Sequence, residues 1–204
     1  MSTTECSSHQ RVIIGISGAS GFSYGVQALR YLRQLNVESH VVISSAAHLN
    51  RRLETTLSEK DIQDLADVVY PFEDIGADIA SGSFRATGML IAPCSMHTLA
   101  AVAAGFSSNL LTRAADVTLK ERRRLILIVR ETPLHAGHLR NMLQVTEAGG
   151  IIFPPVPAWY ARPVSTENII AHSVARALSL LDLDCNALPR WGDLPRQDTR
   201  GESL

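Results

Sequence analysis

The sequence is poor in the features that mark membrane, secreted and nucleic-acid-binding proteins. No apolar run approaches the ~20 residues that a membrane-spanning helix needs, and the polar first residues lack the apolar core of a signal peptide. The net charge of −1 gives no overall attraction to nucleic acid or to an anionic membrane. The 3 cysteines, Cys6, Cys94 and Cys185, are too widely spaced for a disulfide framework or a zinc motif, so we expect a reducing, cytoplasmic location.

The remaining composition is that of an ordinary globular protein, with 204 residues, 46% hydrophobic and 19% charged. This length suits one domain with a full core. We expect a folded domain over residues 11–191, between a loose N-terminal tail (1–10) and a C-terminal tail (192–204). Within it, apolar strands alternate with amphipathic helices. This order predicts an α/β fold with a doubly wound parallel sheet and helices on both faces.

The most informative segment is an apolar run at residues 125–129, which predicts a central parallel strand covered on both faces. Arg130 and Glu131 follow directly at its carboxyl end. Ligands of open α/β sheets bind at the carboxyl ends of the strands. We therefore expect Arg130 and Glu131 to form an ion pair beside a ligand.

The helix before this strand carries further cations. Arg113 and Lys120 are seven residues apart, about two helical turns, and so project from one face. Together with the strand-end pair they predict an anionic ligand, most simply a phosphate. A solvated basic turn is the alternative for charges in this region, and we assign Arg122, Arg123 and Arg124 to it.

A second candidate for phosphate binding follows the first strand, residues 11–16. A small-residue turn leads into a helix over about residues 22–35, and the N–H groups at a helix N-terminus bind anions. We expect the Ser17 and Ser20 hydroxyls to add donors there. A plain turn is the alternative, because the glycine spacing is not that of a dinucleotide fold. The glycines are Gly15, Gly18 and Gly21.

Other predicted strands also end in hydroxyl-bearing residues. Strand 40–43 is followed by Ser44, and a helix after it carries Glu54, by default a surface carboxylate. Strand 89–92 is followed by residues 93–98, which again place hydroxyl groups and backbone amides at a strand's carboxyl end. A helix capped by Ser58 and reaching Val69 is expected to be structural, because its apolar residues recur at helical spacing.

Three residues that could suggest other chemistry are assigned to structure. Cys94 has no base placed beside it by the sequence, and a small buried cysteine is the commoner case. His135 and His138 are three apart on a predicted helix, but a metal site would need a third ligand.

Several motifs, in the same order, resemble those of the UbiX/Pad1 flavin prenyltransferase family, whose members have a flavodoxin-like Rossmann fold. The resemblance covers about residues 12–191. It rests on the following segments: GISGASG at 15–21, SGSF at 81–84, PCSMHTLA at 93–100, NLLTRAADVTLKERR at 109–123, VRETPLH at 129–135 and PPVPAWY-x-RP at 154–163.

The resemblance implies an enzyme that transfers a dimethylallyl group from dimethylallyl phosphate to N5 and C6 of reduced FMN without a metal. The prenylated FMN would serve a UbiD-type decarboxylase. The family also implies a homo-oligomer, typically a dodecamer, with sites at subunit junctions.

The site residues implied by the resemblance fall into three groups. The FMN contacts are Gly18, Ala19, Ser20, Ser44, Ser95, Met96, His97, Thr98 and Arg130. The allyl phosphate contacts are Arg113, Lys120, Glu131, Tyr160 and Arg176. The catalytic candidates are Ser20, Glu54 and Glu131, with Glu54 or Glu131 as a possible acid toward the leaving phosphate.

Three alternatives stay open at this point. One is a flavin-dependent cysteine decarboxylase of the same fold, although the cations favour a phosphate leaving group. Another is a non-catalytic FMN carrier or accessory subunit of a phenolic-acid decarboxylase. The last is a direct decarboxylase that releases CO2 without a partner protein.

Overall fold

The computed structural model describes residues 10–185 and contains one six-stranded sheet in which all pairs are parallel. The spatial order is β3-β2-β1-β4-β5-β6, so the chain reverses direction across the sheet between β1 and β4. The predicted doubly wound α/β fold is confirmed. The strands are β1 (Arg11–Ile16), β2 (Glu38–Ile43), β3 (Val68–Tyr70), β4 (Gly88–Cys94), β5 (Arg124–Val129) and β6 (Ile151–Ile152).

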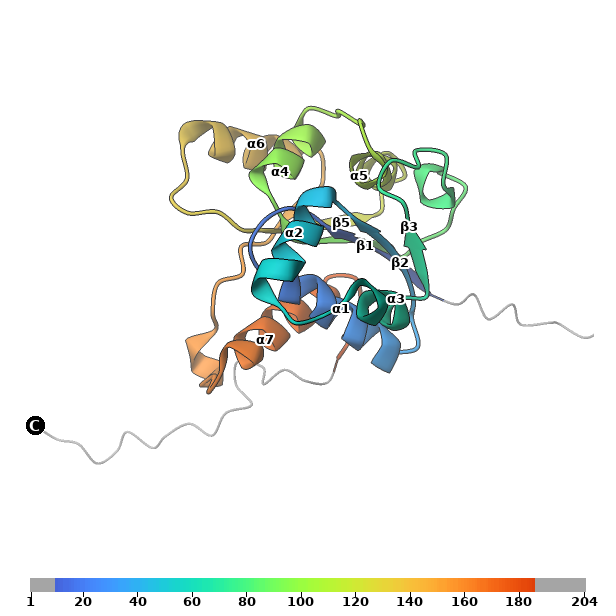
Figure 1. Cartoon of the computed structure of the whole chain (residues 1–204). Helices are drawn as coiled ribbons and strands as arrows, with labels where there is room; N and C mark the ends of the chain where they lie inside the picture. Colours follow the sequence, from blue (N-terminus) through green and yellow to red (C-terminus); the bar gives the residue numbers. More distant parts are fainter. Residues whose placement is uncertain (1–9, 186–204) are drawn as a thin grey trace, which may run out of the picture.

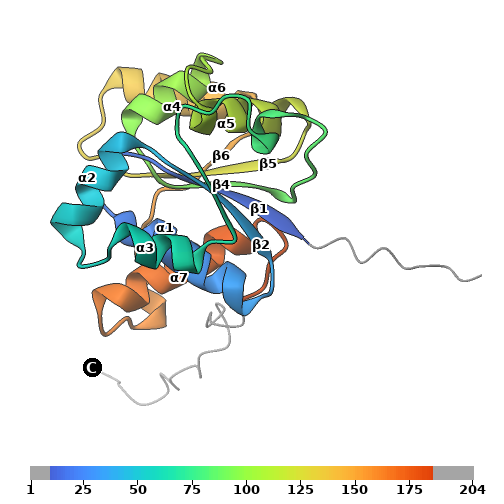
Figure 2. The same cartoon turned by 45° about the vertical axis from the view of Figure 1, so that its right-hand side comes forward.

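Helices cover both faces of the sheet, as Figure 2 shows. One apolar layer packs α1 and α7 against the sheet, and the other packs α4 and α5 against the opposite face. Figure 1 shows α2 beside the sheet, at the end of β2. The helices are α1 (Phe22–Gln34), α2 (Ser45–Glu54), α3 (Glu59–Leu65), α4 (Met96–Ala103), α5 (Leu110–Lys120), α6 (Ala136–Glu147) and α7 (Thr166–Ser179), with short 3₁₀ turns η1 (Asp78–Ala80) and η2 (Trp159–Ala161).

The predicted helix from Ser58 to Val69 is wrong in its second half. Helix α3 ends at Leu65, and Val68–Tyr70 instead form edge strand β3, paired with β2. The Asp67 carboxylate accepts hydrogen bonds from both the backbone N–H and the hydroxyl of Ser39, at 2.7 and 2.8 Å. This anchor joins the chain to β2, and a long-range contact of this kind is invisible to local periodicity.

The expected solvated basic turn at residues 122–124 is wrong for Arg123, which is partly buried, whereas Arg122 and Arg124 are exposed. Arg123 donates to the carbonyl oxygens of Gly82 and Phe84. Arg124 begins β5 and pairs with Asp182 at 2.6 Å. Both side chains therefore tie distant loops together at the amino edge of the sheet.

The predicted tails and the end of the predicted domain lie outside the described residues, except for Gln10. Within residues 10–185, none of the helices combines the length and the apolar character that crossing a bilayer requires.

Candidate functional site

The loops after β1 and β4 meet at the point where the strand order reverses, which is where ligands bind in such sheets. The buried Ser17 hydroxyl donates to the carbonyl of Pro93 at 2.9 Å and accepts from the N–H of Ser95 at 2.7 Å. Ser17 therefore joins the two loops. It was expected to offer a donor to a ligand, and that expectation is wrong because its hydrogen bonds are used inside the protein.

The glycine loop after β1 is shaped by a close approach and a left-handed turn. A Cβ on Gly18 would lie 2.4 Å from the Ala46 Cβ, so only glycine lets this loop touch α2. Gly21 has φ 104°, a conformation that glycine adopts without strain, and it is the N-cap residue just before α1.

The N-terminus of α1 binds a carboxylate of the chain itself. Glu54, at the end of α2, accepts hydrogen bonds from the N–H groups of Gly21 and Phe22 at 2.8 and 2.9 Å. The expected phosphate site at this helix start is therefore wrong, because the Glu54 carboxylate takes the donors. Glu54 is exposed, as the default of a surface carboxylate predicts, and its hydrogen bonds hold it beside the glycine loop.

These contacts also set the charge of Glu54. Partial burial alone would raise its pKa, but the N–H groups of Phe22 and Gly21, the Ser20 hydroxyl and the Arg130 charge outweigh burial and lower the pKa. Glu54 is therefore ionised near neutral pH. It suits a proton acceptor, and its assignment as an acid toward the leaving phosphate is not supported.

The starts of α2 and α4 offer free donors beside this cluster. Ser44 caps α2 by accepting from the N–H of Ala47, and Ser95 caps α4 by accepting from the N–H of Thr98. The preceding N–H groups in each first turn, including those of Met96 and His97, have no acceptor within their helix. Such N–H groups are suited to bind an anion.

Arg130 completes the cluster on the β5 side. Its Nε donates to the carbonyl of Ser20 at 3.1 Å, and its backbone N–H donates to the carbonyl of Cys94. The expected Arg130–Glu131 ion pair is wrong: none joins them among residues 10–185, and Glu131 accepts instead from the N–H of Thr132. The cluster therefore combines the Arg130 cation, the N-termini of α2 and α4 and the small-residue turn after β1. This combination is suited to a phosphate monoester that carries a flat group, as FMN does.

The cations of α5 do not reach this cluster within one chain. Lys120 ends α5, four residues before β5 begins, and pairs with Glu121. It therefore lies at the amino edge of the sheet, whereas Arg130 lies at the carboxyl edge. Arg113, near the start of α5, pairs with Asp116 at 2.9 Å. The assignment of the helix cations to the same ligand as Arg130 and Glu131 stays a prediction. For Lys120 it requires a second subunit, because α5 runs antiparallel to the strands and ends at the opposite edge of the sheet.

Tyr160 and Arg176 lie together on the opposite side of the molecule, around α7. Tyr160 belongs to η2, and its ring meets the ring of His172 edge-on at 5.9 Å. Arg176 lies one turn beyond His172 on α7 and donates to the Ser179 hydroxyl at 2.7 Å. His172 was not among the predicted site residues, although its four-residue spacing from Arg176 places both on one helix face.

Metal and thiol chemistry have no support in the described part of the chain. Among residues 10–185, no group of three or more His, Cys, Asp or Glu side chains is arranged to bind a metal ion. His135 and His138 stack on each other, with ring centroids 3.6 Å apart. Cys94 is fully buried, and burial raises its pKa far above the usual range, so its thiolate does not form near neutral pH.

Comparison with protein families and curated proteins gives consistent results. The flavoprotein family model matches residues 1–178. Flavin prenyltransferase UbiX of Neisseria meningitidis is 59% identical over 182 residues, covering 89% of this chain and 96% of the relative. The mitochondrial flavin prenyltransferase PAD1 of Saccharomyces cerevisiae is 45% identical over 182 residues, covering 89% and 75%.

Solved structures similar to this chain include UbiX-type proteins and a more distant decarboxylase. AnUbiX (PadA1) in complex with FMN and dimethylallyl pyrophosphate matches with a TM-score of 0.89 and 49% identity, covering 90% of this chain and 98% of that one. A dodecameric FMN-dependent UbiX-like decarboxylase from Escherichia coli O157:H7 matches with a TM-score of 0.87 and 44% identity, covering 89% and 99%. The FMN-dependent cysteine decarboxylase TvaF, at 15% identity and a TM-score of 0.60, shares the fold alone.

Proposed function

The chain belongs to the flavoprotein family and, within it, to the flavin prenyltransferases, and we propose that it joins a dimethylallyl group from dimethylallyl phosphate to N5 and C6 of reduced FMN. The observation that carries this proposal is the match along nearly the whole chain to AnUbiX, whose structure holds FMN and a dimethylallyl donor together. FMN is the acceptor in this reaction, and the enzyme needs no metal for it.

We assign FMN to the cluster at the carboxyl edge of β1, β2, β4 and β5. The free N–H groups at the start of α4, capped by Ser95, suit the FMN phosphate. Arg130 adds positive charge on the other side of the same cluster. The full proposed set is Gly18, Ala19, Ser20, Ser44, Ser95, Met96, His97, Thr98 and Arg130.

We assign the donor phosphate to Arg113, Lys120, Glu131, Tyr160 and Arg176. Because Lys120 and Arg130 lie at opposite edges of one sheet, a complete site on this assignment needs residues from neighbouring subunits. This supports a homo-oligomer with sites at subunit junctions, and the dodecameric relative suggests its size.

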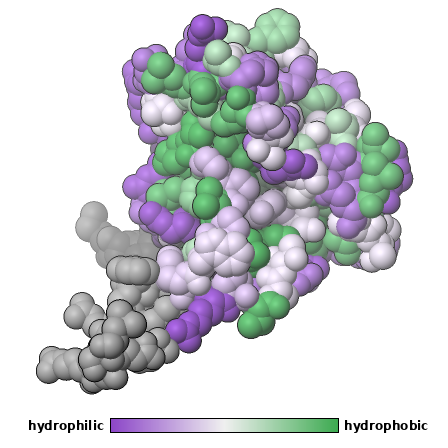
Figure 3. Space-filling model, turned by 90° about the vertical axis from the view of Figure 1, so that its left-hand side faces the viewer, coloured by the Kyte–Doolittle hydropathy of each residue, from purple (hydrophilic) through white to green (hydrophobic). Residues whose placement is uncertain are grey.

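An apolar surface on the described chain is suited to such assembly. Helix α6 exposes Leu139 and Leu143 by 54% and 58%, and Leu134 just before it is exposed by 42%. Figure 3 views the side of the molecule that carries α6. Hydrophobic side chains gather on the upper half of the molecule in this view. Exposed apolar patches on soluble proteins mark interaction surfaces.

The proposed chemistry follows from the charges. When the allylic C–O bond breaks, negative charge develops on the phosphate, and the arginine and lysine side chains stabilise it. The ionised Glu54, held next to Ser20, accepts a proton that the flavin loses as new bonds form. Glu131 remains the candidate acid for the leaving phosphate.

Substitution of Lys120 distinguishes a transferase from an FMN carrier. We expect Lys120→Met to keep bound yellow flavin but to lose turnover by about 10²-fold or more, because a charge that stabilises the leaving phosphate is removed. Lys60→Met is the matched control, since Lys60 pairs with Asp64 on the exposed surface of α3. Normal turnover in Lys120→Met would favour the carrier.

We further propose that the product serves a UbiD-type decarboxylase in the cytoplasm. The alternative function is direct decarboxylation, with release of CO2 from a phenolic acid. It is worth testing because the similar protein from Escherichia coli O157:H7 is named a decarboxylase. Incubating the pure protein with such an acid and no partner protein tests it. We expect no CO2 under these conditions.

A further inference from the structure

Arg51 is a buried charged side chain that the proposed chemistry does not use. It lies in the last turn of α2, three residues before Glu54, and only 6% of it is exposed. Arginine is seldom buried to this extent unless its guanidinium is paired. The turn after α2 supplies the partners: Nη1 donates to the carbonyl of Leu57 at 2.5 Å, and Nη2 pairs with Glu59 at 3.1 Å. The side chain therefore joins the end of α2 to the start of α3.

The backbone of Arg51 holds the same turn. Its carbonyl oxygen accepts hydrogen bonds from both the N–H and the hydroxyl of Thr55, at 3.0 and 2.8 Å. The Thr55 hydroxyl oxygen in turn accepts from the N–H of Leu57 at 3.3 Å. These bonds close a compact turn around one arginine. Glu54 lies between Arg51 and Thr55 in the sequence, so the same bonds restrict its backbone.

The contact of Glu54 with α1 depends on the position of this turn. Its two backbone donors, Gly21 and Phe22, are 33 and 32 residues away in the sequence, and the bonds are 2.8 and 2.9 Å long. Such bonds extend to about 3.2 Å, so a shift of the end of α2 by about 1 Å would break both. Burial raises the pKa of Glu54, while its hydrogen bonds and the charge of Arg130, not that of Arg51, lower it. We therefore expect Arg51 to affect this carboxylate through its position and not through charge.

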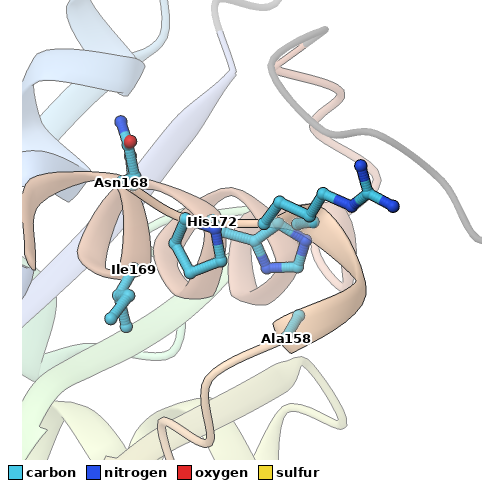
Figure 4. A pocket seen from close by; sticks show the side chains of 8 residues that line it. Ala158, Asn168, Ile169 and His172 are labelled. Atoms are coloured by element: carbon cyan, nitrogen blue, oxygen red, sulfur yellow. The ribbon is translucent and has the colours of Figure 1, made fainter. Parts of the chain in front are cut away.

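The turn after α2 also borders α7, which gives a second route from the turn to the site. Residues 53–57 line a groove of about 610 Å³ together with Glu167 and Ile170 of α7. The opposite face of α7 carries Ile169 and His172. These two line the pocket shown in Figure 4, beside the residues assigned to the donor phosphate. A displaced α7 would therefore weaken donor binding, whereas a displaced Glu54 would slow proton transfer.

We propose that Arg51 is a positioning residue for the prenyl transfer. Its bonds to Leu57 and Glu59 hold the end of α2, so that the Glu54 carboxylate stays at the N-terminus of α1 and in place to accept a proton. This inference rests on the proposed function, in which Glu54 is the base. Arg51 acts through Glu54, and its contacts with the turn are its whole contribution to turnover.

The test is a double-mutant cycle in the full-length, assembled enzyme. We expect Arg51→Met to lower kcat about 10- to 10²-fold, the effect of misplacing a reacting group by about 1 Å, and to leave the KM for dimethylallyl phosphate unchanged. In a Glu54→Gln background the same substitution should lower kcat by less than about twofold more, because the base that it positions is already absent. Arg52→Met is the matched control, since Arg52 is an exposed arginine in the same helical turn, and it should leave kcat unchanged.

Three results would overturn the positioning role while leaving the prenyltransferase intact. They are an unchanged kcat in Arg51→Met, an equal loss in both backgrounds, and a raised KM for the donor with kcat unchanged, which would indicate the route through α7. Because loss of a buried arginine can prevent folding, Thr55→Val provides a second cycle. It removes the hydroxyl contacts of the same turn and should lower kcat only where Glu54 is present. A wild-type enzyme that does not prenylate FMN would instead contradict the proposed function.

Discussion

At the scale of single residues, Glu54 is the group whose setting most constrains the chemistry. It faces the N-terminus of α1 and receives three hydrogen bonds, two of them from backbone N–H groups. A carboxylate so held is a better base than acid near neutral pH. We expect Glu54→Gln to retain FMN and to lose about 10²- to 10⁴-fold in turnover, measured by anaerobic single-turnover mass analysis of the flavin.

The pH dependence gives a second residue-scale prediction. The pKa of Glu54 is lower in the folded protein than in the unfolded chain. Its negative charge and the stability that this charge contributes are therefore fully present above the ordinary carboxyl pKa. Both are lost only as the pH falls through the lowered pKa. Turnover limited by Glu54 should therefore stay level from about pH 7 down to about pH 5, above the ordinary value of about 4.3. A rate that rises on acidification over this interval would mean that Glu54 acts as an acid.

Ser17 provides the residue-scale prediction for stability. Removing the Ser17 hydroxyl deletes two hydrogen bonds, one from the N–H of Ser95 and one to the carbonyl of Pro93. Both backbone groups then lose their Ser17 partner in the protein interior. We expect Ser17→Ala to lower the free energy of unfolding by about 1–3 kcal/mol, measured by urea denaturation. Ser45→Ala, at an exposed position on α2, is the control and should change it by less than about 0.5 kcal/mol.

At the scale of elements, the contact between α1 and the sheet sets the position of the glycine loop. A Cβ on Gly25 would lie 2.6 Å from both the Ala92 carbonyl oxygen and the Ile16 Cδ1. Gly25→Ala should therefore push α1 off the sheet, lower the free energy of unfolding by about 1–3 kcal/mol and weaken FMN binding. Gly76→Ala, whose nearest neighbour would be 3.6 Å away, should behave like the wild type in both measurements.

The strands and helices also show which parts of the site can be predicted from the sequence. Strands β1, β4 and β5 and the residues at their carboxyl ends follow from apolar runs and the parallel-sheet rule, and the structure confirms them. Strand β3 was missed because its pairing depends on Asp67 and Ser39, 28 residues apart. The opposite positions of Lys120 and Arg130 on the sheet were not predicted, because helical spacing gives a face but not the end of the sheet to which a residue belongs.

At the scale of the whole molecule, the proposed site takes residues from more than one subunit. Glu54 lies at the carboxyl edge and Lys120 at the amino edge of the same sheet. Glu54→Gln and Lys120→Met should each be inactive, yet oligomers co-expressed from both should recover about a quarter of the sites by random assembly. If both residues served the site of their own chain, the mixed oligomers would stay inactive.

Every role proposed above depends on the transfer of the dimethylallyl group to FMN. The most direct measurement mixes the purified protein anaerobically with reduced FMN and dimethylallyl phosphate and then determines the mass of the released flavin. We expect a mass gain of one dimethylallyl unit, with release of one phosphate. Unchanged FMN together with intact donor would contradict it and would leave a flavin carrier or a decarboxylase as the function of this fold.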